Sequence, residues 1–196
     1  MTLPHKRTAL ALAILSLLAE APMHPYRMQQ LIRKRGKDRV VNVGQRASLY
    51  QAIERLTAAG LAAIKETSRD PRFPERTVYQ LTDLGRKVLV DWLREGLALP
   101  ERAFPMFPAV LSFMALLTPD DVVAALTQRA TRLAADVEML ETELVTVSVP
   151  RLFLIEDEYR VAQLRAELAW VESVIEDVRA GRLTWTEAWV RAQGAD

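Results

Sequence analysis

Apolar residues recur at helical spacing near the start of the chain. Four of them share one face of a helix expected over residues 6–19: Leu10, Ile14, Leu17 and Leu18. This helix ends before Pro22, because proline disfavours helical geometry in the residue that precedes it. Pro25 suits the first position of a second helix, where its missing N–H leaves no hydrogen bond unmade, and Gly36 ends that helix. The pattern predicts two short helices joined by a turn.

A third helix, ending at Gly60, has one apolar and one polar face. Leu49, Ile53 and Leu56 follow the spacing i, i+4, i+7, so we expect this face to pack inward. The opposite face is then exposed, and its residues are small or polar: Ala47, Tyr50, Gln51, Glu54 and Arg55.

Two short strands follow, at residues 61–65 and 77–81. The intervening residues 66–76 contain Pro71 and Pro74, which argue against strand and for a projecting loop. Thr82 can cap a fourth helix whose buried stripe includes Trp92. Three helices followed by a two-stranded hairpin form the pattern of a winged helix-turn-helix.

The second half of the chain predicts a helical module. Three prolines between residues 99 and 108 mark a linker, so the expected domains are 1–98 and 109–196. A short apolar helix over 109–117 comes first. Two long helices then repeat apolar residues at steps of three and four, as in a coiled coil. The predicted seam residues are Leu126, Ala130, Leu133, Val137, Leu140, Leu144 and Val147, then Val161, Leu164, Leu168, Val171, Ile175 and Val178.

The fold class expected is therefore mainly α: an N-terminal winged helix-turn-helix with a two-stranded wing, then an all-α, coiled-coil-like dimerisation module. The two long helices should pair antiparallel, yet residues off the seam, such as Met139 and Trp170, are also apolar. A two-fold related copy would cover them. The residues assigned to dimerisation are Leu133, Leu140, Leu164, Leu168, Val171 and Ile175. Trp185 and Trp189 are expected on a last short helix as packing anchors.

Charge separates the two halves. Residues 1–95 contain 17 Lys and Arg against 9 Asp and Glu, whereas residues 96–196 contain 9 against 16. A basic surface is attracted to phosphate and an acidic one is repelled. The first half is therefore expected to bind double-stranded DNA, with the second half facing away from it.

Several other classes of protein find little support. The absence of cysteine excludes disulfides, thiolate zinc sites and cysteine nucleophiles. The two histidines are isolated and no glycine-rich phosphate loop is present, so we expect neither an enzyme nor a cofactor or metal. The first apolar run is too short to span a bilayer, which indicates a cytoplasmic protein without a membrane partner.

Residue chemistry suggests how the third helix and the wing would contact DNA. Glutamine pairs bidentately with adenine and arginine with guanine, whereas hydroxyl groups suit phosphate oxygens. On this basis the candidates at the third helix are Gln45, Arg46, Ser48, Tyr50, Gln51 and Arg55. The wing adds Arg69, Arg72 and Arg76, which are placed to reach the backbone or the minor groove. Tyr50 has a competing interpretation as a partly buried packing residue, and the wing arginines as a solvated hairpin tip.

The order of these motifs resembles the PadR-like family of transcriptional regulators over nearly the full chain. The motifs that carry the resemblance are Ala21-Pro22-Met23-His24-Pro25-Tyr26, Ser48-Leu49-Tyr50-Gln51-Ala52-Ile53-Glu54-Arg55-Leu56 before Gly60-Leu61, and Tyr79-Gln80-Leu81-Thr82-Asp83-Leu84-Gly85-Arg86. The stretch from Tyr159 to Trp170 is similar to part of the family's longer C-terminal module. The resemblance implies DNA binding by a homodimer. One departure is Pro25, where the family usually has glycine, so we expect the first turn to be rebuilt slightly without a change of fold.

Aromatic residues near the predicted domain boundary allow two interpretations. Trp92, Phe104, Phe107 and Phe113 either contribute to a pocket for a small aromatic effector or pack the domains together. Release of DNA on binding small aromatic compounds occurs in some members of the family that the chain resembles.

The function expected is that of a sequence-specific, homodimeric repressor, with a small molecule modulating DNA affinity through the C-terminal helices. Two winged helices would sit about one DNA turn apart, ~34 Å. The alternative is a helical protein-interaction or ligand-sequestering module whose winged helix docks protein. Salt separates the two, because only binding to phosphates weakens steeply as salt rises.

Overall fold

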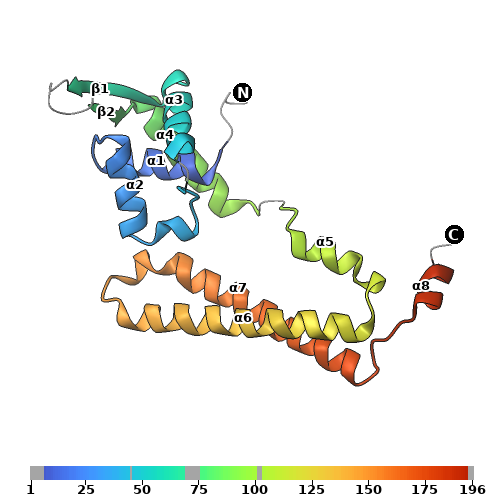
Figure 1. The fold of residues 1–196 in the computed structure, drawn as a ribbon. Helices are drawn as coiled ribbons and strands as arrows, with labels where there is room; N and C mark the ends of the chain where they lie inside the picture. The colour runs from blue at the N-terminus through green and yellow to red at the C-terminus, as the bar shows by residue number, and fades with distance from the viewer. Residues whose placement is uncertain (1–6, 45, 69–75, 101–102, 194–196) are drawn as a thin grey trace. The chain divides into compact units, whose positions relative to one another are not determined.

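The structure is a computed structural model that describes residues 7–44, 46–68, 76–100 and 103–193. The chain divides into two compact units, Met1–Arg102 and Ala103–Asp196. Helices make up most of the described residues, and two strands form the one sheet found among them (Figure 1). The predicted fold class is confirmed.

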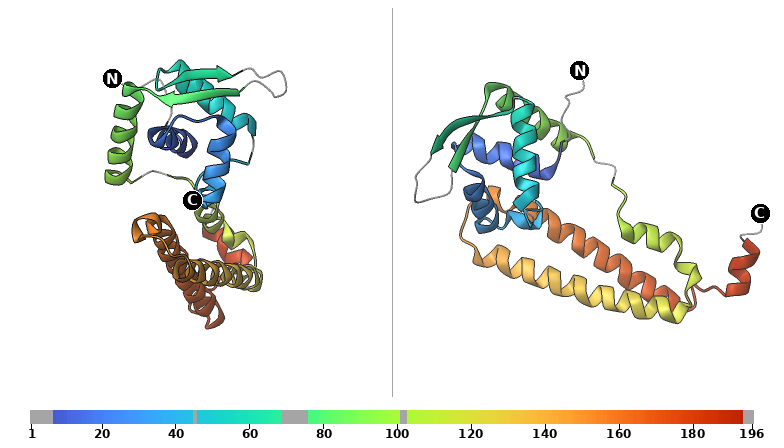
Figure 2. Two further views of the ribbon diagram at one scale, coloured as in Figure 1. Left: turned by 90° about the vertical axis from the view of Figure 1, so that its left-hand side faces the viewer. Right: turned by 45° about the horizontal axis from the view of Figure 1, so that its top comes forward.

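The first unit has the element order of a winged helix. Its elements are α1 (Ala9–Glu20), α2 (Pro25–Lys34), a 3-10 turn (Lys37–Arg39), α3 (Arg46–Ala58), β1 (Ala62–Ser68), β2 (Arg76–Leu81) and α4 (Asp83–Ala98). α1 contacts α2, α3, α4 and β2, and it is seen end-on among them in the left view of Figure 2.

Side-chain caps set where the first two helices begin. The backbone N–H of Ala11 donates to Thr8 Oγ1 at 3.1 Å, so α1 begins after Thr8 rather than at the predicted residue 6. Pro25 occupies the first position of α2, as predicted, and His24 caps this helix by accepting a hydrogen bond from the Arg27 N–H. The departure from the PadR-like motif at Pro25 is therefore accommodated without a left-handed residue.

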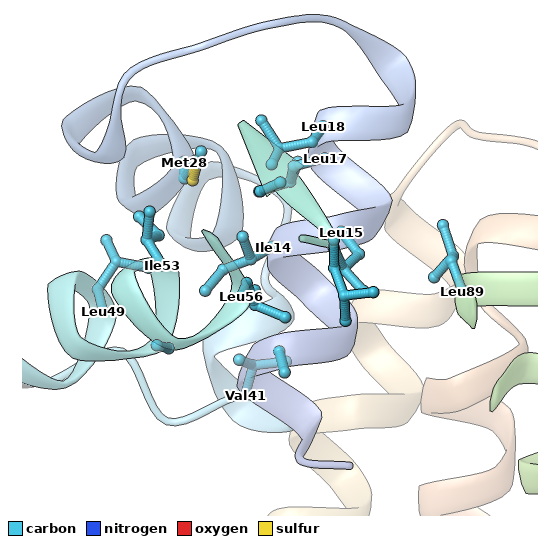
Figure 3. Close-up of a cluster of buried hydrophobic side chains, with 14 of the residues drawn as sticks. Ile14, Leu15, Leu17, Leu18, Met28, Val41, Leu49, Ile53, Leu56 and Leu89 are labelled. Carbon is cyan, nitrogen blue, oxygen red and sulfur yellow. The ribbon is translucent and has the colours of Figure 1, made fainter. Parts of the chain in front are cut away.

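The core of the first unit is aliphatic and closely packed (Figure 3). Ile14 and Leu15 of α1, Met28 of α2, and Ile53 and Leu56 of α3 are almost fully buried. Burial of one such side chain contributes roughly 1.5–3 kcal/mol. The side chains that fix the position of α3 are therefore the ones that hold this unit together.

The wing is an antiparallel hairpin that extends further than predicted. Ala62 pairs with Leu81, and Ser68 pairs with Arg76 at the far end, with a bulge between Ile64 and Glu66. Residues 66–68, expected in a loop, are thus in β1, because both prolines of this segment lie beyond the paired residues. Met23 adds a two-way backbone bridge to Tyr79, at 3.0 Å in each direction.

The second unit is helical. Its elements are α5 (Met106–Ser112), a 3-10 turn (Met114–Leu116), α6 (Pro119–Thr146), a 3-10 turn (Arg151–Phe153), α7 (Ile155–Arg179) and α8 (Glu187–Gln193). The helix expected from Ala109 begins at Met106 instead. Pro108 falls in its first turn, where a backbone N–H has no helical partner to lose.

α6 and α7 lie side by side over most of their length in Figures 1 and 2. The predicted seam forms their contact: Leu133, Leu140 and Val171 are buried, and Leu164 and Leu168 are half-buried. Arg129 Nε donates to Glu167 Oε1 at 2.6 Å across the pair. Val147, the last predicted seam residue of the first long helix, is exposed just beyond the end of α6.

Trp185 was predicted on the last helix, but it precedes α8. It is buried and its Nε1–H donates to the Leu117 carbonyl at 2.9 Å. Trp189 does lie on α8 and is exposed. Only the first of the two tryptophans is a packing anchor within the second unit.

Candidate nucleic-acid interface

α3 presents one buried and one exposed face, as the sequence predicted. Leu49 and Ile53 are each 1% exposed, and Leu56 is fully buried. On the other face, Tyr50 is 48% exposed, and Gln51 is exposed as well. The aliphatic face is held by the core, so the polar face is free to meet a ligand in solution.

The connection into α3 is fixed by buried groups. Val41 and Val43 are both buried in the core of the first unit. Gln29, a buried polar residue of α2, donates from Nε2 to the Val43 carbonyl at 3.0 Å. A buried amide left without this partner would cost about 1–3 kcal/mol, so this hydrogen bond ties α2 to the residues that precede α3.

The exposed side chains of α3 differ in how they are held. Arg55 folds along its own helix, with its Nε donating to the Gln51 carbonyl at 3.1 Å. Ser48 is half-buried in the first turn of the helix. Tyr50 is about half exposed, so its contact with DNA stays a prediction beside its interpretation as a partly buried packing residue.

Tyr79 of β2 lies close to this face. Burial raises the pKa of its phenol above the ordinary value, and the nearby Glu54 carboxylate and Tyr50 hydroxyl act in the same direction. The Tyr79 ring also packs against the core. β2 therefore supports the same turns of α3 that expose Tyr50 and Gln51.

Some predicted contact residues cannot be placed as side chains. Gln45, Arg69 and Arg72 lie outside the described residues. For Arg46 and Arg76 the structure describes the backbone, at the start of α3 and of β2 respectively.

The residues predicted for an effector pocket have different surroundings. Trp92 is buried in the core of the first unit. In the second unit Phe104 is 92% exposed and Phe113 is also exposed. Phe107 is half-buried, with the Arg129 guanidinium carbon 3.4 Å from its ring centroid and the Trp170 ring 6.2 Å away, edge to face.

The residues predicted for dimerisation lie between α6 and α7 of the same chain. Leu140 is 1% exposed and Val171 is fully buried there. The exposed large apolar residues of the second unit are others, and they include Phe104, Met106, Val110, Phe113, Leu116, Met139, Val145, Leu152, Tyr159 and Trp170. Helical periodicity identified buried positions correctly but did not say which partner buries them.

A recess beside α3 was missed by sequence reasoning, although its two arginines belong to the charged run Arg33-Lys34-Arg35-Gly36-Lys37-Asp38-Arg39. It occupies about 410 Å³ and is lined by Arg33, Asp38, Arg39, Val40, Asn42, Val43 and Gly44. The recess is formed by the path of the backbone after α2. That path could not be predicted from the spacing of residue types in the sequence.

Within residues 7–44, 46–68, 76–100 and 103–193, no cluster of three or more His, Asp or Glu side chains is arranged to hold a metal ion. No helix in those ranges is long and apolar enough to cross a membrane.

Residues 14–91 match the model of the transcriptional regulator PadR-like family. The match covers most of α1, then α2, α3, both strands and the first part of α4. The resemblance predicted from the motifs is confirmed over these residues, which match the winged helix-turn-helix of the PadR-like transcriptional regulators. A search of curated proteins gave no match.

Solved structures show the same fold. Bacillus subtilis PadR in complex with operator DNA has a TM-score of 0.66 and 21% identity, covering 87% of this chain and 99% of its own. Bacillus subtilis PadR in complex with p-coumaric acid has a TM-score of 0.70 and 18% identity, covering 88% and 99%. A PadR-like transcriptional regulator from Bacillus cereus has a TM-score of 0.60 and 15% identity, covering 89% and 98%. The likeness includes the second, helical unit.

Proposed function

We propose that this protein is a sequence-specific, DNA-binding transcriptional repressor that acts as a homodimer. The observation that carries the proposal is the exposed polar face of α3, backed by Leu49, Ile53 and Leu56 in the core. A helix held in this way can enter the major groove and present side chains to base edges. Support also comes from the structure of Bacillus subtilis PadR with operator DNA, which shares the fold.

The candidate residues have distinct roles in this proposal. Gln51 pairs bidentately with an adenine, and so does Gln45, whereas Arg46 suits guanine. Tyr50 and Ser48 contact phosphate oxygens, and Arg55 adds positive charge on the same face. In the wing, Arg69, Arg72 and Arg76 contact the backbone or the minor groove.

A second copy of the chain is the partner proposed for the second unit. The α6–α7 seam is already buried within one chain, so the open apolar residues on the outer faces, such as Met139 and Trp170, would form the contact between copies. Two-fold pairing would provide two reading heads, and each dimer would then recognise two half-sites.

Modulation by a small aromatic molecule is the remaining part of the proposal. Its support is the shared fold with Bacillus subtilis PadR, which has been solved with p-coumaric acid. Phe104, Phe107 and Phe113 of the second unit stay candidates for contact with such a molecule, whereas Trp92 is buried in the core of the first unit. A fall in DNA affinity when p-coumaric acid is added would support this part, and unchanged affinity at saturating acid would contradict it for that compound.

Salt dependence of binding to duplex DNA tests the main proposal. With six or more phosphates contacted, the affinity should fall by about 10³-fold or more between ~50 and ~200 mM salt. A protein-docking winged helix would instead show little affinity for any duplex even at the lower salt. That result would overturn DNA binding.

A further inference from the structure

The recess before α3 carries an excess of positive charge. Among its lining residues are two arginines, Arg33 and Arg39, and one carboxylate, Asp38, so the formal charge of the lining is +1 (2 minus 1). Arginine presents several N–H donors in a planar fork that matches the oxygens of a phosphate. The lining therefore has the chemistry of an anion site.

An amide adds donors to the same recess. Asn42 Oδ1 accepts a hydrogen bond from the Gly44 backbone N–H at 3.1 Å. Since the oxygen is used in this way, the two hydrogens on Nδ2 are what the Asn42 side chain offers to a ligand. Asn42 is exposed, so these donors are accessible.

The recess is built on a fixed backbone. Val41 and Val43, on either side of Asn42 in the chain, are buried in the core, and Gln29 Nε2 donates to the Val43 carbonyl at 3.0 Å. Gly36, with a φ of 67°, makes the left-handed turn from which the connection starts. A ligand would therefore meet a preformed site, and binding would not have to order this segment.

The position of the recess indicates which anion it would take. Gly44 lies two residues before Arg46, the first residue of α3. In helix-turn-helix proteins the N-terminal residues of the recognition helix contact base edges, so whatever precedes that helix lies at the border of the groove. The groups that line a DNA groove at its border are backbone phosphates.

We propose that the recess formed by Arg33, Arg39, Asn42 and Gly44 binds a phosphate group of the DNA backbone beside the groove that α3 enters. This inference rests on the proposed function, since it requires the chain to bind DNA. It adds a contact that positions α3 on the duplex without reading sequence. Asp38 opposes this contact, because its carboxylate lies in the same lining and repels the phosphate.

Two substitutions of opposite expected effect test the site. Arg33→Gln should lower affinity for a mixed-sequence duplex of about 30 base pairs. The magnitude of its salt slope should fall by about 2, one phosphate for each half of the dimer, so the loss of affinity between ~50 and ~200 mM salt becomes roughly tenfold smaller than for the unaltered protein. Asp38→Asn should raise affinity at ~50 mM salt, because it removes one repulsive carboxylate from each recess.

The matched control is Arg132→Gln, which removes the same group from an exposed position on α6. Its salt slope should equal that of the unaltered protein. Thermal unfolding of each variant shows whether it is folded. Asp38→Asn is expected to raise DNA affinity, so the proposal can still be tested if Arg33→Gln is destabilised.

A free phosphate ion presents the same oxygens, so a second arm replaces sodium chloride with sodium phosphate at equal ionic strength. A recess that DNA occupies predicts lower DNA affinity in sodium phosphate for the unaltered protein and little change for Arg33→Gln, because free phosphate then competes with the backbone for the recess. Thermal stabilisation of the unaltered protein by phosphate, absent in Arg33→Gln, together with equal DNA affinities of the two proteins, would mean that the recess takes free phosphate only and would overturn the assignment.

The outcomes separate this inference from the proposed function. Steep, salt-dependent DNA binding that is identical in the unaltered protein, Arg33→Gln and Asp38→Asn would overturn the recess as a phosphate site and leave DNA binding intact. No duplex binding by the unaltered protein at ~50 mM salt would overturn both.

Discussion

Gly85 shows how close the packing of the first unit is at a single residue. A Cβ atom at this position would lie 2.0 Å from the Leu61 carbonyl oxygen and 2.9 Å from Leu81 Cδ1. The start of α4 can approach the start of β1 only because residue 85 has no side chain. This close contact packs the start of α4 against the start of β1.

Gly85→Ala should destabilise the protein by about 1–3 kcal/mol, because the backbone at Leu61 has to move. Gly96→Ala on the same helix is the control. The nearest atom to its added Cβ would be 4.0 Å away, so it should be neutral or stabilising by up to about 1 kcal/mol. Urea unfolding measures both, and equal effects of the two substitutions would contradict this view of the contact.

At the scale of elements, an ion pair links the ends of α1 and α2. Arg35 Nη1 and Nη2 donate to Glu20 Oε1 and Oε2 at 2.5 and 2.7 Å. The hydrogen bonds from Arg35 hold the pKa of Glu20 below the ordinary 4.5. Both side chains are more than a third exposed, so the pair contributes at most about 1 kcal/mol.

The stability supplied by this pair should depend on pH. Because the pKa of Glu20 is lower in the folded than in the unfolded protein, the contribution is present above pH 4.5 and is lost as pH falls through the folded-state pKa. Glu20→Gln should therefore be less stable than the unaltered protein at neutral pH, and the difference should vanish in acid. Thermal unfolding across that range measures it, and a difference independent of pH would exclude the ion pair as its cause.

Helices and strands could be predicted from the sequence where one periodic pattern of apolar residues determined them. The residues at which they begin and end were predicted less accurately. The two faces of α3 follow from Leu49, Ile53 and Leu56 alone, since a helix held by three aliphatic residues has one orientation. β1 runs to Ser68 and α5 begins at Met106, because strand pairing and the tolerance of Pro108 in a first turn depend on neighbours that sequence spacing does not show. The recess before α3 depends on the turn at Gly36 and on which valines face the core.

At the scale of the whole molecule, periodicity left the partner of the long helices undetermined. Apolar residues repeated at steps of three and four predict that Leu140 and Val171 are buried. The partner that buries them can be a neighbouring helix of the same chain or a helix of a second chain. The structure shows the first arrangement, with α6 against α7. The proposed homodimer then has to use the apolar residues that this pairing leaves open.

Adjacent residues of α6 separate folding from association. Leu140→Ala should lower folding stability by about 2–5 kcal/mol, because Leu140 is 1% exposed in the seam. Met139→Glu should leave stability within about 0.5 kcal/mol, because Met139 is 45% exposed, but should weaken dimerisation. Thermal unfolding and sedimentation velocity measure the two properties. A Met139→Glu protein that remains as dimeric as the unaltered one would place the contact between copies elsewhere.

Selection of bound sequences from a random duplex pool, carried out in parallel for the unaltered protein and Gln51→Ala, tests most directly whether the exposed face of α3 reads DNA. The expected result is a two-fold symmetric site for the unaltered protein, and for Gln51→Ala the same site with preference lost at one base pair in each half. Gln51 is exposed, so the substitution should not disturb folding. Failure to enrich any sequence, or an identical site from both proteins, would contradict base reading by this face.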